Sequence, residues 1–158
     1  MEPRLDPFAS PLMGKVIKHL AAADRPIAES ALPLAVQELV RLRVSQINGC
    51  GVCVDMHFKE AVHAGEDPVR LNLVVAWREA TVFTEAERAA LELAEQGTRI
   101  ADAAGGVGDE AWAEAAKHYD EEQLAALVCV IAMINAFNRA NVMLRHPAGS
   151  YEVGMYRS

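Results

Sequence analysis

The chain has 158 residues, of which 52% are hydrophobic and 23% are charged, and its formal net charge is −7. This size and composition predict one soluble globular domain over residues 1–158. The acidic balance argues against nucleic acid and against an anionic membrane surface, because both need a basic face on the protein. The start of the chain does not resemble a secretory signal, and no run of about 18 uninterrupted apolar residues occurs, so we expect a cytoplasmic protein that spans no membrane.

The composition predicts an all-α fold. Alanine is abundant, aromatic residues are few and runs of β-branched residues are short, which favours a single helical bundle of about six to eight helices. Prolines in residues 1–11 predict an extended arm, and a short helix over residues 13–23 is expected to end at Pro26. A longer helix is predicted over residues 33–48, where apolar positions repeat with helical spacing.

Capping residues mark the remaining helices. The last of them is apolar almost all round, so we expect it to lie at the centre of the fold, and residues 152–158 should form an irregular tail. After the turn at Asn48-Gly49 we predict a helix over residues 50–65, and then a helix capped by Asp67. The capping box of Thr84 and Glu87 predicts a helix that ends at Gln96. Asp109 is expected to cap a helix over residues 109–118, and Asp120 with Gln123 precedes the last helix, over residues 124–145.

The most informative segment is Cys50-Gly51-Val52-Cys53-Val54-Asp55-Met56-His57. In a helix Cys50, Cys53 and His57 share one face, because they stand at i, i+3 and i+7. Two thiols one turn apart can close a small disulfide, and a histidine one turn further on can take a proton from the second thiol. The exposed N–H groups of a first helical turn also favour a thiolate. These residues predict an accessible dithiol redox site.

Glu38 is the candidate partner of this histidine. On one continuous helix Glu38 would lie roughly 18 Å from Cys50, out of reach. A break at Asn48-Gly49 lets two helices fold back antiparallel, which offsets Glu38 and His57 by roughly 6 Å. A carboxylate on one imidazole nitrogen would fix the tautomer and raise the basicity of the other nitrogen. Taken alone, Glu38 is equally typical of a solvated helix residue.

Two other interpretations of the cysteines remain open. A zinc site needs four ligands, and the C-x2-C-x3-H spacing supplies three, so we expect no bound metal. The remaining cysteine, Cys129, lies in an apolar run, where we expect it to pack as a small hydrophobic residue that does not react. Cys50 and Cys53 could also be buried and inert.

The other polar residues of note have structural interpretations. Asn135 and Asn138 stand near apolar segments and predict buried polar groups that hold helices in register. The remaining histidines suggest no site: His19, His63 and His118 are expected to be solvated, and His146 before Pro147 to mark a turn.

One pattern begins at Glu38 and continues, after an eleven-residue gap, with Cys50-x-x-Cys53 and then x3-His57. This pattern resembles the AhpD-like alkylhydroperoxidase branch of the carboxymuconolactone decarboxylase family. The similarity covers roughly residues 30–152. It includes Glu38-Leu39-Val40-Arg41, Gln46-Ile47-Asn48-Gly49-Cys50, Lys59-Glu60-Ala61, Trp77-Arg78-Glu79-Ala80, Thr84 to Leu91, Ile134-Asn135-Ala136-Phe137-Asn138-Arg139 and Gly149-Ser150-Tyr151-Glu152.

The resemblance implies an all-helical homotrimer or homohexamer that reduces organic hydroperoxides. In that scheme Cys53 attacks the peroxide and becomes a sulfenic acid, Cys50 resolves it as a disulfide, and Glu38 and His57 belong to a proton relay. A dithiol donor protein of the lipoyl type would then reduce the disulfide, with no bound cofactor. Relays of the family often carry a second histidine just before the second cysteine. Here that position is Val52, so deprotonation of Cys53 would depend on His57 directly or on a water.

Two alternative functions are compatible with the sequence. A non-catalytic redox-sensing oligomeric module would use the same disulfide as a switch. Carboxymuconolactone decarboxylase activity ranks lower, because that chemistry does not require the C-x-x-C motif.

Overall fold

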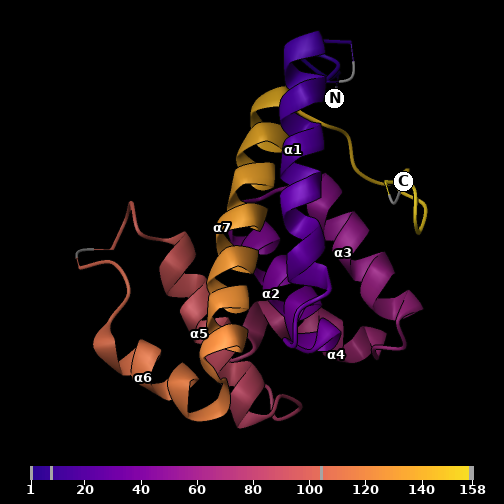
Figure 1. Ribbon diagram of the computed structural model, residues 1–158. Helices are drawn as coiled ribbons and strands as arrows, with labels where there is room; N and C mark the ends of the chain where they lie inside the picture. The colour runs from indigo at the N-terminus through magenta and orange to yellow at the C-terminus, as the bar shows by residue number, and fades with distance from the viewer. Residues whose placement is uncertain (1, 8, 104, 157–158) are drawn as a thin grey trace.

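The computed structural model describes residues 2–7, 9–103 and 105–156, and over these residues the chain is all-helical (Figure 1). This confirms the predicted fold class. The helices in chain order are α1 (Pro11–Ala28), α2 (Leu34–Ile47), α3 (Gly51–His63), α4 (Pro68–Asn72), the 3-10 helix η1 (Leu73–Ala76), α5 (Glu85–Thr98), α6 (Asp109–His118) and α7 (Glu121–Leu144).

Helix α2 lies at the centre of the fold, packed against α3, α5 and α7. Its Val40 and Val44 are fully buried in one apolar cluster with residues of α5 and α7. Its Leu39 and Leu42 are buried in a second cluster with residues of α3, η1 and α5. Because α2 is covered on both sides, most of its polar side chains are buried in the interior, where they need partners.

The predicted capping boxes begin α5 and α7. The Thr84 hydroxyl accepts from the Glu87 N–H at 3.3 Å, and the Glu87 carboxylate accepts from the Thr84 N–H at 2.8 Å. Asp120 and Gln123 exchange the same two bonds. These reciprocal bonds satisfy N–H groups that a helix start leaves free. Helix α7 therefore begins directly after Asp120, a few residues earlier than predicted.

The prediction that Pro26 ends the first helix is wrong, because α1 continues through it to Ala28. Proline cannot donate to the carbonyl one turn back, that of Ala22. Ala22 and Pro26 are both exposed, so water can satisfy that carbonyl at little cost. The helix also begins earlier than predicted, because Ser10 caps it and Pro11 occupies its first position.

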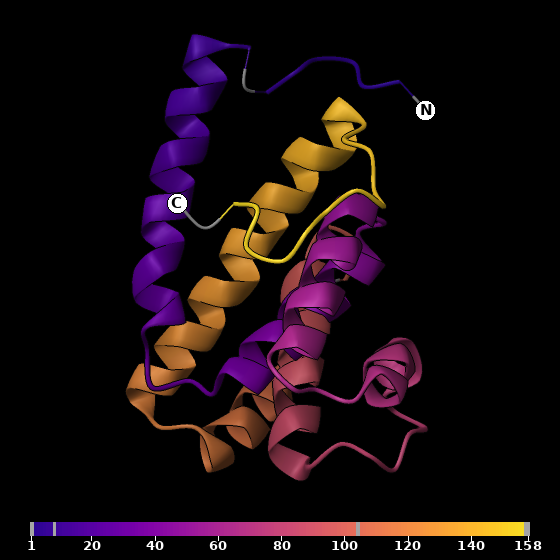
Figure 2. The ribbon, with the colours of Figure 1, turned by 90° about the vertical axis from the view of Figure 1, so that its right-hand side faces the viewer.

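Helices α1 and α7 meet where α1 ends and α7 begins, and they diverge toward the other end (Figure 2). Helix α7 is long and apolar enough to cross a membrane by length and composition alone. Its Asn135 and Asn138 are buried, however, and the Asn48 side chain donates to both at 3.0 Å. These bonds confirm that the two asparagines hold α2 and α7 in register, as expected of a core helix.

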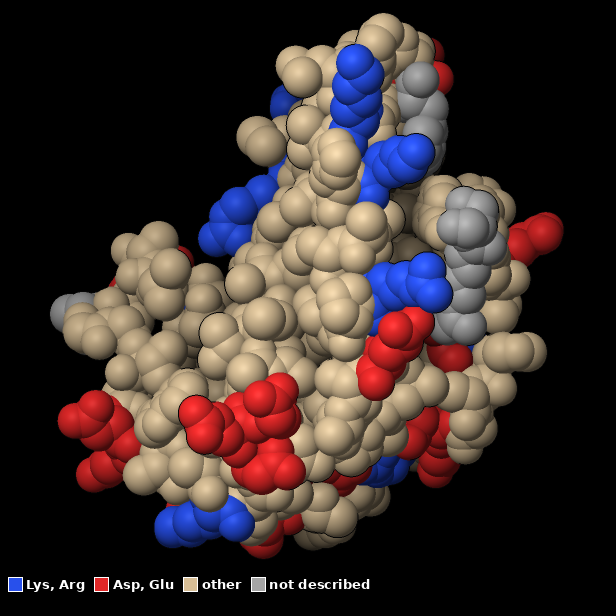
Figure 3. All heavy atoms as spheres, in the orientation of Figure 1, with Lys and Arg blue, Asp and Glu red and all other residues tan. Residues whose placement is uncertain are grey.

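One face of α7 does not match the prediction of an all-round buried helix. Val128, Cys129 and Met143 are exposed on it, although its opposite face supplies Leu127 and Val130 to the core. On the face of the molecule shown in Figure 3, basic side chains lie mostly over the upper half and acidic side chains mostly over the lower half, with some of the two in contact, and much of the remaining surface is uncharged. The apolar face of α7 therefore lacks a covering element over part of its length.

The chain after α7 returns along α3, and we call residues 146–154 the C-terminal strap (Figure 2). Its backbone is tied to α3 side chains: the Gly149 N–H donates to Asp55 at 2.8 Å, and Lys59 donates to the Tyr151 carbonyl at 2.9 Å. The Tyr151 hydroxyl also donates to Glu60. The irregular backbone of residues 152–156 matches the predicted tail, and residues 157–158 lie outside the described residues. The attachment of the strap to α3 was not predicted.

Candidate active site

The two cysteines stand at the start of α3. Cys50 is the N-cap residue and Cys53 lies in the first turn, so the helix begins one residue later than predicted. Gly49 adopts a φ of 66°, which suits glycine and makes the tight turn from α2 possible. The Cys50 N–H then donates to the Ser45 carbonyl at 3.0 Å. This geometry brings the two Sγ atoms to 2.7 Å, and no disulfide joins them.

Both thiols are buried, contrary to the expectation of an accessible site. Cys50 is 2% exposed and Cys53 is 1% exposed, and both belong to the apolar cluster around α2 and α7. Val52, at the position of the missing relay histidine, is buried in the same cluster. Both sulfurs are therefore closed to bulk solvent in this conformation.

Burial is not the dominant influence on the pKa of Cys53. The hydrogen bond from the Cys50 thiol is the largest influence on its pKa, and with the Asn141 hydrogen bond and the charge of His57 it outweighs burial and lowers the pKa of Cys53 to about 6. The same hydrogen bond and burial raise the pKa of Cys50 well above its ordinary value. At neutral pH the pair therefore consists of a Cys53 thiolate and a Cys50 thiol that donates to it.

Helix α7 supplies a contact to Cys53 that was not predicted from the sequence. The Asn141 side chain donates from Nδ2 to the Cys53 Sγ at 3.3 Å. Its Oδ1 lies 3.2 Å from Nδ1 of His146, the residue expected only to mark a turn. A sequence signal existed, since Asn135, Asn138 and Asn141 repeat every three residues along α7.

The predicted pair of Glu38 and His57 is present. Helices α2 and α3 fold back on each other, and Glu38 Oε2 lies 2.8 Å from His57 Nδ1. Both side chains are buried, so Glu38 is not a solvated helix residue. His57 Nε2 has no hydrogen-bond partner among the residues that the structure describes. The imidazole thus has one nitrogen held by a carboxylate and the other free to exchange a proton.

Arg41 completes the surroundings of Glu38 and was missed from the sequence. Its guanidinium donates to Glu38 Oε1 at 2.9 Å and to Asp24 of α1 at 3.2 Å. Burial alone would raise the pKa of Glu38, but the His57 hydrogen bond and the Arg41 charge outweigh burial and lower it. Glu38 is therefore a carboxylate at neutral pH, and α1 is tied to it through Arg41.

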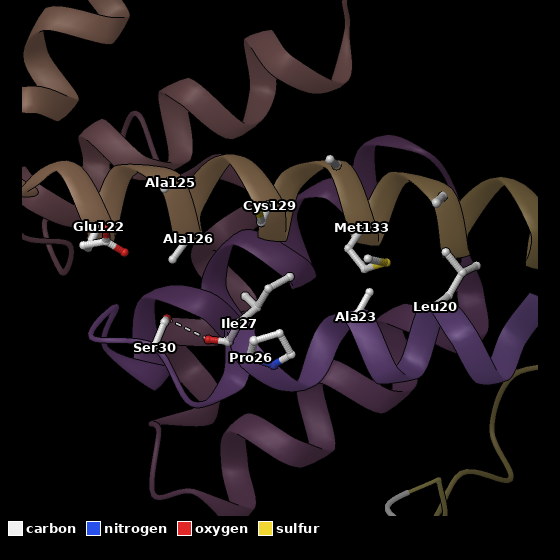
Figure 4. A pocket seen from close by; sticks show the side chains of 12 residues that line it. Leu20, Ala23, Pro26, Ile27, Ser30, Glu122, Ala125, Ala126, Cys129 and Met133 are labelled. Atoms are coloured by element: carbon white, nitrogen blue, oxygen red, sulfur yellow. Dashed lines mark hydrogen bonds between the residues drawn. The ribbon is translucent and has the colours of Figure 1, made fainter.

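Cys129 is not part of this site, and the expectation that it is packed in the core is wrong. It is exposed and lines an apolar groove of about 480 Å³ between α1 and α7. Figure 4 shows Leu20, Ala23 and Ile27 of α1 facing Cys129 and Met133 of α7 across this groove. The apolar run around Cys129 misled the prediction because its helix keeps one face uncovered. Over the described parts of the chain, no three His, Cys, Asp or Glu side chains are grouped to hold a metal ion.

Comparison with known proteins places these residues in a family. The sequence profile of the carboxymuconolactone decarboxylase family matches residues 11–96. The chain is 39% identical over 134 residues to the uncharacterized protein YdfG of Bacillus subtilis. The aligned region covers 85% of this chain and 90% of YdfG.

Crystal structures of similar proteins show the same fold. A protein of unknown function from Agrobacterium tumefaciens, described as a candidate antioxidant defence protein AhpD, superposes with a TM-score of 0.87 and 34% identity, over 95% of this chain and 100% of that one. An uncharacterized peroxidase-related protein with an AhpD core from Ralstonia eutropha gives a TM-score of 0.74 at 16% identity, over 87% and 72% of the two chains. The chain therefore belongs to the carboxymuconolactone decarboxylase family, in its AhpD-like branch.

Proposed function

We propose that the protein is a cytoplasmic thiol peroxidase that reduces organic hydroperoxides with Cys50 and Cys53 as its redox pair. The observation that carries the proposal is the pair of sulfurs 2.7 Å apart, with the pKa of Cys53 lowered to about 6. A thiolate beside a resolving thiol is the arrangement from which reversible thiol oxidation proceeds. Membership of the AhpD-like branch supports the same chemistry.

In the proposed reaction the Cys53 thiolate attacks an oxygen of the hydroperoxide. The S–O bond forms as the O–O bond breaks, which leaves a sulfenic acid on Cys53 and an alkoxide that takes up a proton as alcohol. The Cys50 sulfur then attacks the Cys53 sulfur, and water leaves as the disulfide forms. An external dithiol returns two electrons and two protons, and we propose a donor protein of the lipoyl type for this step.

His57 and Glu38 would handle the protons. His57 lies one turn after Cys53 on α3, within range of an i, i+4 side-chain contact. Its free Nε2 can give a proton to the leaving alkoxide, while Glu38 holds Nδ1 and stabilises the imidazolium. A small cavity of about 80 Å³ is lined by Glu38 and Glu66, which gives water a place beside the carboxylate.

We also propose that the protein self-associates, as a homotrimer or homohexamer. Leu12, Val16 and Leu20 form one apolar stripe with the residues of α1 that face α7. Leu12 is 74% exposed and Val16 is 49% exposed, and the only buried residue of α1 is Ile27. An isolated helix of this length is marginal in water, so a second copy that covers the stripe would stabilise it.

A redox-sensing module is the second candidate, and the burial of both thiols favours it. A switch needs the disulfide to form but needs no rapid access for a hydroperoxide. The two functions differ in turnover: a sensor is oxidised once, whereas a peroxidase consumes hydroperoxide for as long as a dithiol is supplied.

The test is consumption of cumene hydroperoxide with a dithiol reductant. We expect Cys53→Ser to abolish turnover and Cys50→Ser to leave a sulfenic acid on Cys53 that dimedone traps. Glu38→Gln should slow turnover roughly tenfold to a hundredfold, the usual effect of losing a group that orients a histidine. Cys129→Ser is the control and should turn over like the unaltered protein. A single stoichiometric oxidation without turnover would support the sensor instead.

A further inference from the structure

We propose that Asn141 is a catalytic residue that holds the Cys53 thiolate with its amide N–H, and that His146 is a positioning residue that fixes which way this amide points. The proposal deepens the proposed function and rests on its dithiol chemistry. Residues at the start of α3 already contact the Cys53 sulfur, and Asn141 adds a contact from a second helix, α7.

The contact to the sulfur is specific to one orientation of the amide. Asn141 places Nδ2 3.3 Å from the Cys53 Sγ, within the longer hydrogen-bond range of sulfur. A rotation of the amide by 180° would place Oδ1, an acceptor with no proton, against the thiolate. Only the observed orientation stabilises the negative charge on the sulfur. A residue that fixes the orientation of the amide therefore also affects the pKa of Cys53.

His146 supplies that orientation. Its Nδ1 lies 3.2 Å from Asn141 Oδ1, and an oxygen there can only accept, so Nδ1 carries the proton. The backbone fixes His146 in place, because its N–H donates to the Asn141 carbonyl at 3.0 Å. Arg145 adopts the left-handed conformation at the end of α7, with a φ of 57°, and this reversal turns the chain back toward Asn141.

The arrangement forms a chain of contacts from the C-terminal strap to the nucleophile: His146 to Asn141, and Asn141 to Cys53. Val52 in the position before Cys53 is buried among apolar side chains and cannot donate to the sulfur. In this protein the amide of Asn141 therefore supplies a donor that the residue preceding Cys53 does not.

The test is the pKa of Cys53, measured in the reduced protein in a Cys129→Ser background from thiolate absorbance at 240 nm against pH. Asn141→Asp replaces the donor with a negative acceptor of the same shape and should raise the pKa by more than one unit. Asn141→Ala should raise it less, and His146→Ala should raise it less again. Because His146 acts through Asn141, the double variant should match Asn141→Ala alone. Asn72→Asp on α4, which is exposed, is the matched control.

An unchanged pKa in Asn141→Asp would overturn the role of Asn141. A His146→Ala shift that adds fully to that of Asn141→Ala would overturn the role of His146, since it would show an independent effect. Circular dichroism melting of each variant separates these outcomes from loss of the fold. The measurement uses no peroxide, so a protein with the expected shifts and no peroxidase turnover would contradict the proposed function and leave this inference intact.

Discussion

At the scale of single residues, the site gathers three kinds of support around one sulfur. Cys50 donates a thiol hydrogen bond, Asn141 an amide N–H, and His57 a nearby positive charge. Burial opposes all three, because it disfavours a charged thiolate. The pKa of Cys53 falls only because the hydrogen bonds and charge outweigh the cost of burial, so each of them is open to a direct test.

We predict that the alkylation rate of Cys53 by iodoacetamide depends on pH with a midpoint at about 6. The pKa is lowered, so the thiolate is present above the midpoint and the rate falls as pH drops through it. His57→Ala should move the midpoint upward and slow alkylation at neutral pH, because a positive charge near the thiolate is lost. Mass spectrometry of the labelled peptide in a Cys129→Ser background is the measurement.

His63→Ala, on the same helix but exposed, is the control for this prediction. The midpoint should stay at its original value in that variant. If His57→Ala left the midpoint unmoved as well, His57 would have a structural role only, and the relay would be excluded.

The sequence predicted the residues of this site that share a local pattern. Cys50, Cys53 and His57 follow helical spacing, and Glu38 needed only the break at Asn48-Gly49 to reach His57. Asn141 and Arg41 could not be assigned in the same way. Asn141 meets Cys53 across 88 positions of sequence, and Arg41 meets Asp24 of α1 across 17 positions, through packing between helices that spacing does not reveal.

At the scale of elements, the sequence predicted helix starts reliably where a side chain makes a hydrogen bond to the backbone of the helix that it caps. The capping boxes at Thr84 and Asp120 involve residues three apart, so their bonds follow from sequence. The C-terminal strap has no such pattern, because its bonds run from its backbone to α3 side chains. Irregular segments of this kind are positioned by tertiary contacts that spacing does not reveal.

We predict that the strap controls access to the thiols. A Cβ placed on Gly51 would lie 3.2 Å from the Cβ of Ala148, so the strap passes directly over the first turn of α3. Asp55→Ala removes the acceptor of the Gly149 and Tyr151 N–H groups. Losing hydrogen bonds to a carboxylate costs about 2 kcal/mol, which should make opening of the strap about thirtyfold more frequent.

Hydrogen–deuterium exchange over residues 146–154, together with the reaction of Cys53 with a bulky aromatic disulfide, measures this opening. Both should become faster in Asp55→Ala. Asp102→Ala removes an exposed carboxylate elsewhere and should change neither. Faster exchange without faster thiol reaction would mean that substrate enters by another route.

At the scale of the whole molecule, the buried apolar residues are unevenly distributed among the helices. The clusters around α2 contain most of the buried apolar residues, whereas α1 contributes only Ile27 to them. The groove between α1 and α7 and the exposed stripe of Leu12 and Val16 form one continuous apolar region along α1. Such a surface on a small protein is typical of an interface between copies.

We predict that light scattering gives a multiple of the chain mass of 17.1 kDa at micromolar concentration. Val16→Glu places a charge in the apolar stripe and should shift the mass toward that of one chain, because the charge would have to be buried in the interface. Ala21→Glu adds the same charge on the opposite face of α1 and should leave the mass unchanged. A single-chain mass for the unaltered protein would contradict the proposed assembly.

The ion pair between Arg41 and Asp24 links the position of α1 to the surroundings of Glu38. Arg41 holds both Asp24, on the helix that the assembly would support, and Glu38, which orients His57. A shift of α1 on dissociation would draw the guanidinium away from the carboxylate that it neutralises. Specific activity would then fall on dilution while the two sulfurs remained in place, so rates measured at a single enzyme concentration would understate the capacity of the assembled protein.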